Sequence, residues 1–330
     1  MKKVILISTV LFIYTNIHAQ CGSGQSITLS TQAAVNNFIN NYCIEFLGNL
    51  TIQDDNNGVD NITNLSPLLG LKKVGGLLIL QNNTSLTSFQ GLDSIRQVGA
   101  LRIFQNPHID SLGGFHSLKF ILGDLWISAN ENVKTLKGLD RVTHVAGNTV
   151  ISFNPALTNL QGLEGLRITS GILIYNNAEL SSIQAIKDID AFSIIFNPLA
   201  IEDIGIYNNS KLRFCANDFI CTVLTIPQID FKIENNAPYC NSEEQILETC
   251  VVSTDAQSIH SYKIFPNPAI NQINIEIDQA CDVFIYSPLG VKLLSIHLSP
   301  GLNTFDISGL ERGMYFIVNE NRILDRVIKH

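Results

Sequence analysis

The sequence predicts a solenoid built on a parallel β-sheet, followed by a small all-β antiparallel sandwich. The first observation is a segment of the form Gly-x-Leu-x-Ile that ends in asparagine and recurs along the middle of the chain. Its asparagines lie 24, 24, 24 and 23 residues apart, and a fixed period of this length is typical of solenoids. The second observation is a change beyond residue 262 to short strands of alternating polarity, which favour a sandwich. The repeated asparagines are Asn82, Asn106, Asn130, Asn154 and Asn177.

One repeat unit explains why the units must stack. In the unit that ends at Asn106, Leu101 and Ile103 lie on one face of a short strand, because side chains alternate along a strand. The asparagine follows at a turn, where its amide can satisfy unpaired backbone groups. A single unit cannot bury its apolar side chains, so stacked copies share one core. We therefore expect Leu101, Ile103, Leu125 and Ile127 to be buried.

The composition favours a folded and exported protein. The chain has 330 residues, of which 45% are hydrophobic and 15% charged, so a sizeable core is available. Lysine and arginine number 21 against 29 acidic residues, a balance that argues against a nucleic-acid partner. Seven cysteines indicate an oxidising compartment.

The N-terminus has the three parts of a secretory signal peptide. Met1-Lys2-Lys3 is positively charged, an apolar run follows, and Ile17-His18-Ala19 is a cleavage site, so residues 1–19 are predicted to be removed. The apolar run is too short to span a bilayer and no later run is long enough, so no transmembrane segment is predicted. A lipoprotein anchored through Cys21 is the alternative, which the preceding glutamine disfavours because that residue should be small.

Residues 20–47 are predicted to form a cap over the first coil. Ser30 or Thr31 can begin a helix there, since both residue types are good N-caps. Cys21 and Cys43 flank this helix, and a bridge between them would stabilise the cap by about 3 kcal/mol in the loop-entropy model. A cap is needed because an exposed first coil leaves core residues and strand edges open.

An acidic stretch over residues 54–60 follows the first predicted strand, Leu50–Gln53. Calcium binding is one interpretation of these acids. The alternating spacing of an EF-hand loop is absent, however, and no glutamate occupies its twelfth place. We therefore expect a solvated turn.

The coils are expected within residues 48–212. Ile194–Asn197 repeats the strand-and-asparagine pattern only 20 residues after Asn177. The similar segment Ile204–Asn209 follows too soon for a full coil. We therefore predict an irregular last turn over residues 198–212.

The repeat pattern resembles the leucine-rich repeats of receptor L-domain-like proteins on bacterial cell surfaces. The resemblance covers about residues 21–250 and implies a leucine-rich-repeat-like solenoid with disulfide-stapled caps, the second of which is a cysteine-rich cap over residues 213–250. Four cysteines in that cap allow three pairings, which the sequence leaves open. Zinc is the alternative use, which the cysteine spacing and the oxidising compartment disfavour. The disulfide candidates are Cys21, Cys43, Cys215, Cys221, Cys240 and Cys250.

The chain changes character after this cap. Residues 251–261 have no sustained periodicity and are predicted to form a linker. Residues 262–330 contain several alternating segments that favour an Ig-like antiparallel sandwich. Cys281 is the odd cysteine, which we expect to remain a half-buried thiol. Strands are expected over residues 273–277, 282–286, 291–294, 314–318 and 326–329.

This C-terminal region resembles the C-terminal sorting domain of the type IX secretion system of Bacteroidetes-type bacteria. The resemblance begins with Phe265-Pro266-Asn267-Pro268-Ala269, in which phenylalanine takes a place usually held by tyrosine, and ends with Lys329-His330. It implies export through the periplasm to the outer cell surface, removal of the domain by the sortase of that system, and attachment to a surface polysaccharide. The sorting-signal residues are Pro266, Asn267, Pro268, Gly290, Gly313, Tyr315 and Lys329.

No catalytic set stands out in the sequence, and we predict a protein that is not an enzyme and needs no cofactor or metal. The histidines in the repeats, His108, His116 and His144, fall at different places in the repeat register. None has the i,i+4 spacing of a metal site, and no Gly-x-Ser-x-Gly elbow or phosphate-binding glycine loop occurs. We expect ordinary solvated histidines.

The outer face of the repeat sheet is the candidate binding surface. If Leu101 and Ile103 point inward, the residues between them point outward, and the same register exposes Leu78, Leu80, Val150, Ser152 and Leu173. Exposed aromatic rings can stack on a sugar or anchor a protein, although neighbours in a parallel ladder can also simply cover one another. The candidate ligand-binding residues are Arg102, Phe104, Trp126, Ser128 and Tyr175.

The sequence thus predicts a secreted, surface-displayed binding or adhesion module whose ligand is an unidentified protein or glycan. A structural surface-layer component without a specific ligand is the alternative from another class. A hydrolase would need a catalytic domain for which the chain has no room.

Overall fold

The computed structural model describes residues 20–22, 24–38, 44–55, 58–195, 203–226, 229–251, 262–286, 292–319 and 322–330. The predicted signal peptide, nearly all of the predicted linker, Cys43 and Gly290 lie outside the described residues.

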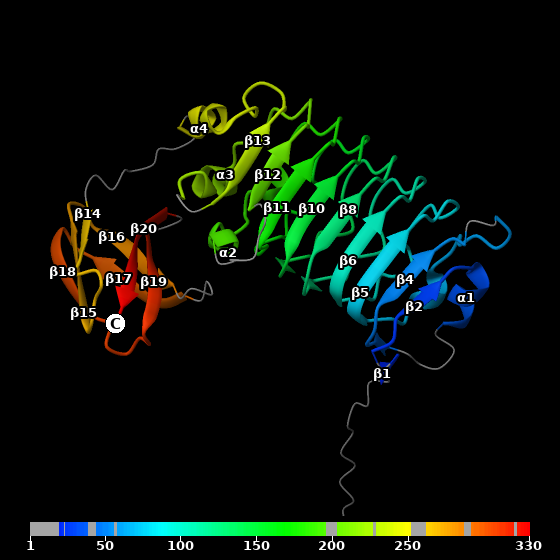
Figure 1. Ribbon diagram of the computed structural model, residues 1–330, viewed down its shortest axis with the longest axis horizontal. Coiled ribbons are helices and arrows are strands. Elements are labelled where there is room, and N and C mark those ends of the chain that lie inside the picture. Colours follow the sequence, from blue (N-terminus) through cyan, green and yellow to red (C-terminus); the bar gives the residue numbers. More distant parts are fainter. Residues whose placement is uncertain are drawn as a thin grey trace, which may run out of the picture.

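The described part of the chain before the linker contains a parallel β-solenoid of about eight turns. Figure 1 shows its strands side by side in sequence order, with α1 (Gln32–Asn37) beside the first strands and α3 (Asp218–Val223) and α4 (Glu243–Val251) at the opposite end. All neighbouring strands of this sheet are parallel. The main strands, in order, are β2 (Ile27–Leu29), β4 (Leu50–Gln53), β5 (Lys73–Gln81), β6 (Gln97–Phe104), β8 (Leu125–Ser128), β10 (Asn148–Ser152), β11 (Gly171–Tyr175), β12 (Ile204–Tyr207) and β13 (Phe231–Glu234). The short strands β7 (Phe120–Ile121) and β9 (His144–Val145) pair with each other, and β7 also pairs with the start of β6.

The core forms as the repeat unit predicts. Leu101 pairs with Leu125 and Ile103 with Ile127 across β6 and β8, and all four side chains are fully buried. They belong to one continuous apolar cluster that runs from Leu29 to the C-terminal cap. Each coil therefore completes the core of its neighbours, which is why the units are stable only as an array.

The N-terminal end joins the sheet instead of only covering it. Helix α1 begins after Thr31, whose hydroxyl accepts a hydrogen bond from the Ala34 N–H at 3.1 Å, as expected of an N-cap. Val35 of this helix is fully buried, and the ring of Phe38 packs against Phe46 at 5.6 Å. The short strands β1 (Gln20–Cys21) and β3 (Glu45–Phe46) pair with each other, and β3 also pairs with β5.

The prediction of a solvated turn after β4 is wrong for Asp54, the first acidic residue of that stretch. Asp54 is buried, and its carboxylate accepts hydrogen bonds from the Ile62 N–H at 2.7 Å and from the Thr84 N–H and hydroxyl at 2.7 and 2.9 Å. These bonds replace the water that the carboxylate loses. Asp54 therefore holds the first loop against the next coil.

The predicted outward orientation of Leu78 and Leu80 is also wrong. Leu78 pairs with Leu101 and Leu80 with Ile103, so both leucines point inward and are fully buried. The error comes from taking Asn82 as the repeated asparagine, whereas Asn83 occupies that position. A shift of one residue moves every side chain of a strand to the other face.

The end of the array differs from the predicted irregular turn. Phe192–Ile195 forms the short helix α2, whereas Ile204–Tyr207 is a regular strand that pairs with β11. A longer connection between β11 and β12 displaces the last strands from the 24-residue period. One further strand, β13, extends the sheet into the region that the sequence assigned to the cap.

Two disulfides staple the C-terminal cap. Cys215 is bonded to Cys240 and Cys221 to Cys250, which selects one of the three pairings that the sequence left open. They close segments separated by 25 and 29 residues, and each contributes about 3.5 kcal/mol in the loop-entropy model.

The C-terminal region is antiparallel and all-β, and it has its own core. Val283, Ile285 and Ile317 of one sheet pack with Ile273 and Ile275 of the other. Cys281 lies half-buried in this region. The sequence did not predict the strands β14 (Tyr262–Phe265) and β18 (Gly301–Asp306). One sheet contains β14 (Tyr262–Phe265), β15 (Gln272–Ile277) and β18 (Gly301–Asp306), and the other contains β17 (Lys292–Leu298), β16 (Cys281–Tyr286), β19 (Gly313–Asn319) and β20 (Arg322–Lys329).

Candidate functional site

The strand ends are held by a ladder of asparagine side chains, six of the seven buried, which we call the asparagine ladder. Asn130 is typical: its Nδ2 donates to the carbonyl oxygens of Ile103 at 3.0 Å and Ser128 at 3.1 Å, and its N–H donates to the Oδ1 of Asn154 at 3.1 Å. Each member thus joins its own coil to the coils on both sides. The members are Asn83, Asn106, Asn130, Asn154, Asn177, Asn209 and Asn236.

The residue before each ladder asparagine has a left-handed backbone. Ala129 and Phe153 have φ of 55°, and the others lie between 52° and 56°. A non-glycine residue in this region is strained, so the neighbouring buried bonds must hold it there. The strand ends are therefore fixed in the same geometry in successive coils. The left-handed residues are Asn82, Gln105, Ala129, Phe153, Asn176, Asn208 and Asn235.

The outward side chains form two rows across this rigid sheet, and together the rows define the sheet face. The first row is Ile79, Arg102, Trp126, Val150, Leu173, Gly205 and Lys232. The second row is Gln81, Phe104, Ser128, Ser152, Tyr175, Tyr207 and Glu234.

Four of the five predicted ligand-binding residues meet in one recess of about 340 Å³, which we call the aromatic recess. The guanidinium carbon of Arg102 lies 5.5 Å from the centre of the Trp126 ring, a cation–π contact. Trp126 is 37% exposed, so its ring remains available to a ligand. The lining residues are Arg102, Phe104, Gln105, Trp126, Ser128 and Ala129.

Tyr175, the fifth predicted residue, lies in a second aromatic group farther along the sheet. Its ring stacks on Tyr207 with centroids 4.9 Å apart and planes at 10°, and it meets Phe153 edge-on at 5.6 Å. The ammonium of Lys232 lies 4.3 Å from the Tyr207 ring centre. The sequence analysis did not nominate Phe153, Tyr207 or Lys232. Two signals were present: Phe153 directly precedes a repeated asparagine, and an Asn-Asn pair follows each of the strands β12 and β13.

Small polar residues separate the two aromatic groups. Ser152 is buried and its hydroxyl donates to the Ser128 hydroxyl at 3.0 Å. Val150, beside it in the first row, is also buried, so the prediction that Ser152 and Val150 would be exposed is wrong. With strands about 4.8 Å apart, Phe104 and Tyr175 stand three strands, or about 14 Å, apart.

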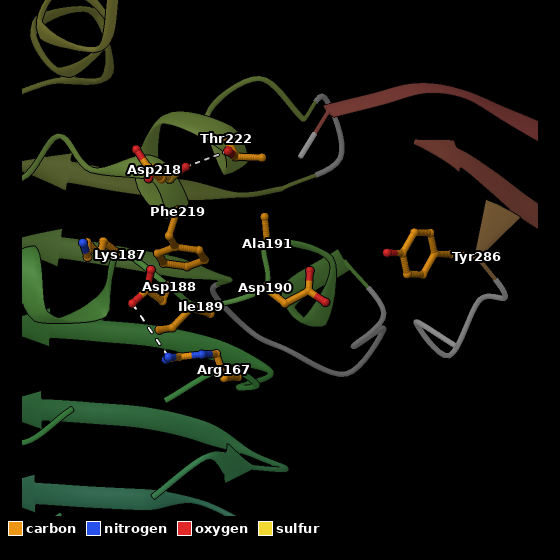
Figure 2. Close-up of a pocket in the computed structure, with 10 residues that line it drawn as sticks. All are labelled: Arg167, Lys187, Asp188, Ile189, Asp190, Ala191, Asp218, Phe219, Thr222 and Tyr286. Atoms are coloured by element: carbon orange, nitrogen blue, oxygen red, sulfur yellow. Dashed lines mark hydrogen bonds and ion pairs between the residues drawn. The ribbon is translucent and has the colours of Figure 1, made fainter. Parts of the chain in front are cut away.

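A second cavity, of about 440 Å³, lies near the end of the solenoid and mixes both signs of charge. Figure 2 shows Arg167 paired with Asp188, and the hydroxyl of Tyr286 pointing toward Asp190. Burial, and then the negative charge of Asp190, raise the pKa of Tyr286. Within the described ranges, no group of three or more histidine, cysteine, aspartate or glutamate side chains has the arrangement of a metal site.

The predicted sorting signal is brought together at one edge of the C-terminal region. The Oδ1 of Asn267 accepts a hydrogen bond from the Ile328 N–H at 2.9 Å, and Gly313 pairs with Lys329 between β19 and β20. The Tyr315 hydroxyl donates to the Glu311 carbonyl oxygen at 2.8 Å. Residues from the beginning, middle and end of the region therefore share one folded edge.

Comparison with known proteins identifies this region. Residues 263–329 match the family described as secretion system C-terminal sorting domains. Such a domain indicates export by type IX secretion, to the cell surface or beyond. No curated protein matches the chain. In the described part of the chain, no helix is long and apolar enough to cross a membrane.

Proposed function

We propose that the chain is a binding or adhesion module displayed on the outer cell surface, with its sorting domain serving only for export. The domain binds the secretion machinery, is removed by the sortase of that system, and leaves a mature chain that is joined to a surface polysaccharide. A cleaved N-terminal signal peptide first takes the chain into the periplasm. The match at residues 263–329 supports the route, and the sheet face supports the role.

The aromatic recess is the observation that carries the binding role. Trp126 and Phe104 stand on a sheet whose strand ends are fixed by buried hydrogen bonds, so a ligand would not need to order them. Arg102 adds a charge beside an exposed indole, and both residue types are enriched where binding energy is concentrated. The second group around Tyr175 extends the same surface.

A leucine-rich-repeat-like solenoid is the frame that we propose for this surface. The coil length near 24 residues, the inward Leu and Ile pairs and the asparagine ladder support that assignment. The disulfide-stapled C-terminal cap agrees with it.

The test is saturable binding of the full chain to cells and to a glycan array. Trp126→Ala should weaken binding by about 2 kcal/mol or more if the indole is an anchor, because truncation removes its whole contact area. Phe214→Ala is the matched control, since Phe214 is 62% exposed and lies outside the two rows of the sheet face. It should leave affinity unchanged.

Two outcomes would contradict the proposal. Equal affinity of the Trp126→Ala variant and the native chain would remove the recess from the site. A complete lack of saturable binding would favour the structural surface-layer component.

A further inference from the structure

A groove of about 540 Å³ lies at a corner of the solenoid, away from the sheet face, and we call it the basic groove. Backbone bonds place its residues side by side: the Lys119 N–H donates to the Arg96 carbonyl at 2.9 Å, and the Thr143 N–H donates to the Lys119 carbonyl at 3.1 Å. Three successive coils thus contribute to it. Its lining residues are Arg96, Ser117, Lys119, Phe120, Arg141 and Thr143.

The basic groove is cationic in an acidic protein. Three of its six lining residues are cations and none is acidic, although the chain carries a formal net charge of −8. Arg96, Lys119 and Arg141 are exposed, and among the residues that the structure describes none of them has a carboxylate within 4.0 Å. Their charges are therefore available to an anionic ligand.

The cations continue beyond the groove as a row. The Arg96 N–H donates to the carbonyl of Lys72 at 2.8 Å, and the Arg167 N–H donates to the carbonyl of Thr143 at 3.0 Å. Arg167 pairs with Asp188 at 3.8 Å, so the cations without a carboxylate partner among the described residues run over four coils, from Lys72 to Arg141, or about 14 Å with coils about 4.8 Å apart. A ligand that follows it must be an extended chain with repeated negative charge.

The groove also has groups that suit a sugar ring. Phe120 is 37% exposed, with the Lys119 ammonium 5.6 Å from its ring centre and the His144 ring 5.4 Å away. An exposed aromatic face can pack against the apolar face of a sugar. The Ser117 hydroxyl can donate to and accept from sugar hydroxyls, and the Thr143 hydroxyl, which is hydrogen-bonded to the His144 Nδ1 at 2.8 Å, keeps lone pairs that can accept.

We infer that the basic groove binds an acidic polysaccharide, with its carboxylate or sulfate groups on Arg96, Lys119 and Arg141 and one sugar ring against Phe120. A polysaccharide with one acidic group per sugar suits about one cation per coil. Duplex DNA carries one charge per about 1.7 Å of its axis, which is far denser than this row and unsuited to the acidic surface around it.

The test measures binding of the full chain to immobilised polygalacturonate, dextran sulfate and uncharged dextran. The two charged probes separate carboxylate from sulfate recognition. The triple variant Arg96→Gln, Lys119→Gln, Arg141→Gln should bind its acidic probe about tenfold or more weakly, because three exposed charge contacts are lost. Lys134→Gln, Lys137→Gln, Arg213→Gln is the matched control, since it removes three exposed cations that lie outside the groove.

The native chain should bind one or both acidic probes, lose affinity as salt increases, and ignore dextran. Phe120→Ala should weaken that binding severalfold without changing its salt dependence, because the ring carries no charge. Equal losses in the two triple variants would overturn the proposal by reducing it to net charge. The proposal would also be overturned if dextran bound as tightly as the acidic probes, or if neither acidic probe bound. Duplex DNA that bound more tightly than the acidic probes, and whose binding the groove triple variant abolished, would overturn it as well.

Discussion

The Oδ1 of Asn154 accepts two hydrogen bonds from Asn130, one from its backbone N–H at 3.1 Å and one from its side-chain Nδ2 at 3.3 Å. The same pair of bonds links Asn106 to Asn130 and Asn154 to Asn177. Because both residues are buried, no water competes for these groups. The asparagine ladder therefore holds the coils in register.

Asn130→Ala should lower the free energy of unfolding by about 3 kcal/mol. The change leaves the carbonyl oxygens of Ile103 and Ser128, and the N–H of Asn106, without their buried side-chain partner. Denaturant unfolding measures the loss. Asn132→Ala is the control, since Asn132 is exposed and makes one hydrogen bond, to the Pro107 carbonyl oxygen. A loss no greater than that of the control would contradict the structural role of the ladder.

Ile127→Asp should destabilise the solenoid by several kcal/mol, because it buries an unpaired charge at a fully buried core position. Thermal melting followed by circular dichroism measures the effect. The exposed change Asn132→Asp should leave the melting temperature nearly unaltered. Cooperative melting of the Ile127→Asp variant at the native temperature would count against the inward register of β8.

Much of this fold was predictable because the coil is a local unit that repeats. Leu101 and Ile103 identify the inward face of β6 without any knowledge of its neighbours. The alignment of β5 was not predictable in this way, because Asn82 and Asn83 offer two registers. Only the backbone distinguishes them: Asn82 has φ of 52°, whereas Asn83 is buried and bonded to Asn106.

The candidate site was predictable only where the period is regular. Arg102 and Trp126 meet because β6 and β8 keep the 24-residue spacing. Tyr207 escaped prediction because Asn177 and Asn209 are 32 residues apart, and the intervening segment contains a helix that resembles a strand in sequence. The groove lined by Arg141 was missed because its cations lie on the returning part of the coil, which the pattern of strands does not describe.

Asp203→Asn should stabilise the protein at neutral pH, but not at a pH so low that Asp203 is protonated in both the folded and the unfolded state. Burial raises the pKa of Asp203 above its ordinary value of 3.8. The hydrogen bond that its carboxylate accepts from the Asp230 N–H at 3.1 Å lowers the pKa by less, and the negative charge of Asp230 raises it further. The folded state therefore holds the proton more tightly than the unfolded state. The stability that protonated Asp203 contributes is complete below the pKa of Asp203 in the unfolded state, and it is lost as pH rises through the higher pKa of Asp203 in the folded state.

Melting temperatures of the native chain and the Asp203→Asn variant across pH 3 to 7 test this. Asparagine keeps an oxygen for the Asp230 N–H, so the hydrogen bond remains. The variant should melt higher at neutral pH, and the difference should vanish in acid. Asp230→Asn should give a smaller gain, because it removes the repulsion and leaves the burial. A difference that is constant with pH would exclude titration of Asp203 as its cause.

Residues from about Tyr262 onward should be absent from the mature surface protein. Deletion of 262–330 should leave the chain in the periplasm, and fusion of those residues to a passenger should carry the passenger out. Mass spectrometry of the surface form should find a C-terminus between residues 251 and 261. Recovery of peptides that include Lys329-His330 from the exported surface form would show that the domain is retained.

The asparagine ladder also bears on how such a chain changes over generations. Its bonds fix each strand end and join each coil to the next, and it stops where the Asn236 N–H donates to the Oδ1 of Asn241 in the cap, at 2.9 Å. The same bonds recur from Asn106 to Asn209, so the ladder does not limit the number of coils between the two ends of the array. Duplication of one gene segment of repeat length would add a coil and lengthen the displayed surface by about 4.8 Å, and the new asparagine would meet the same partners in the coils on both sides. Selection can therefore change the number of coils, and with it the length of the displayed surface, without redesigning the core.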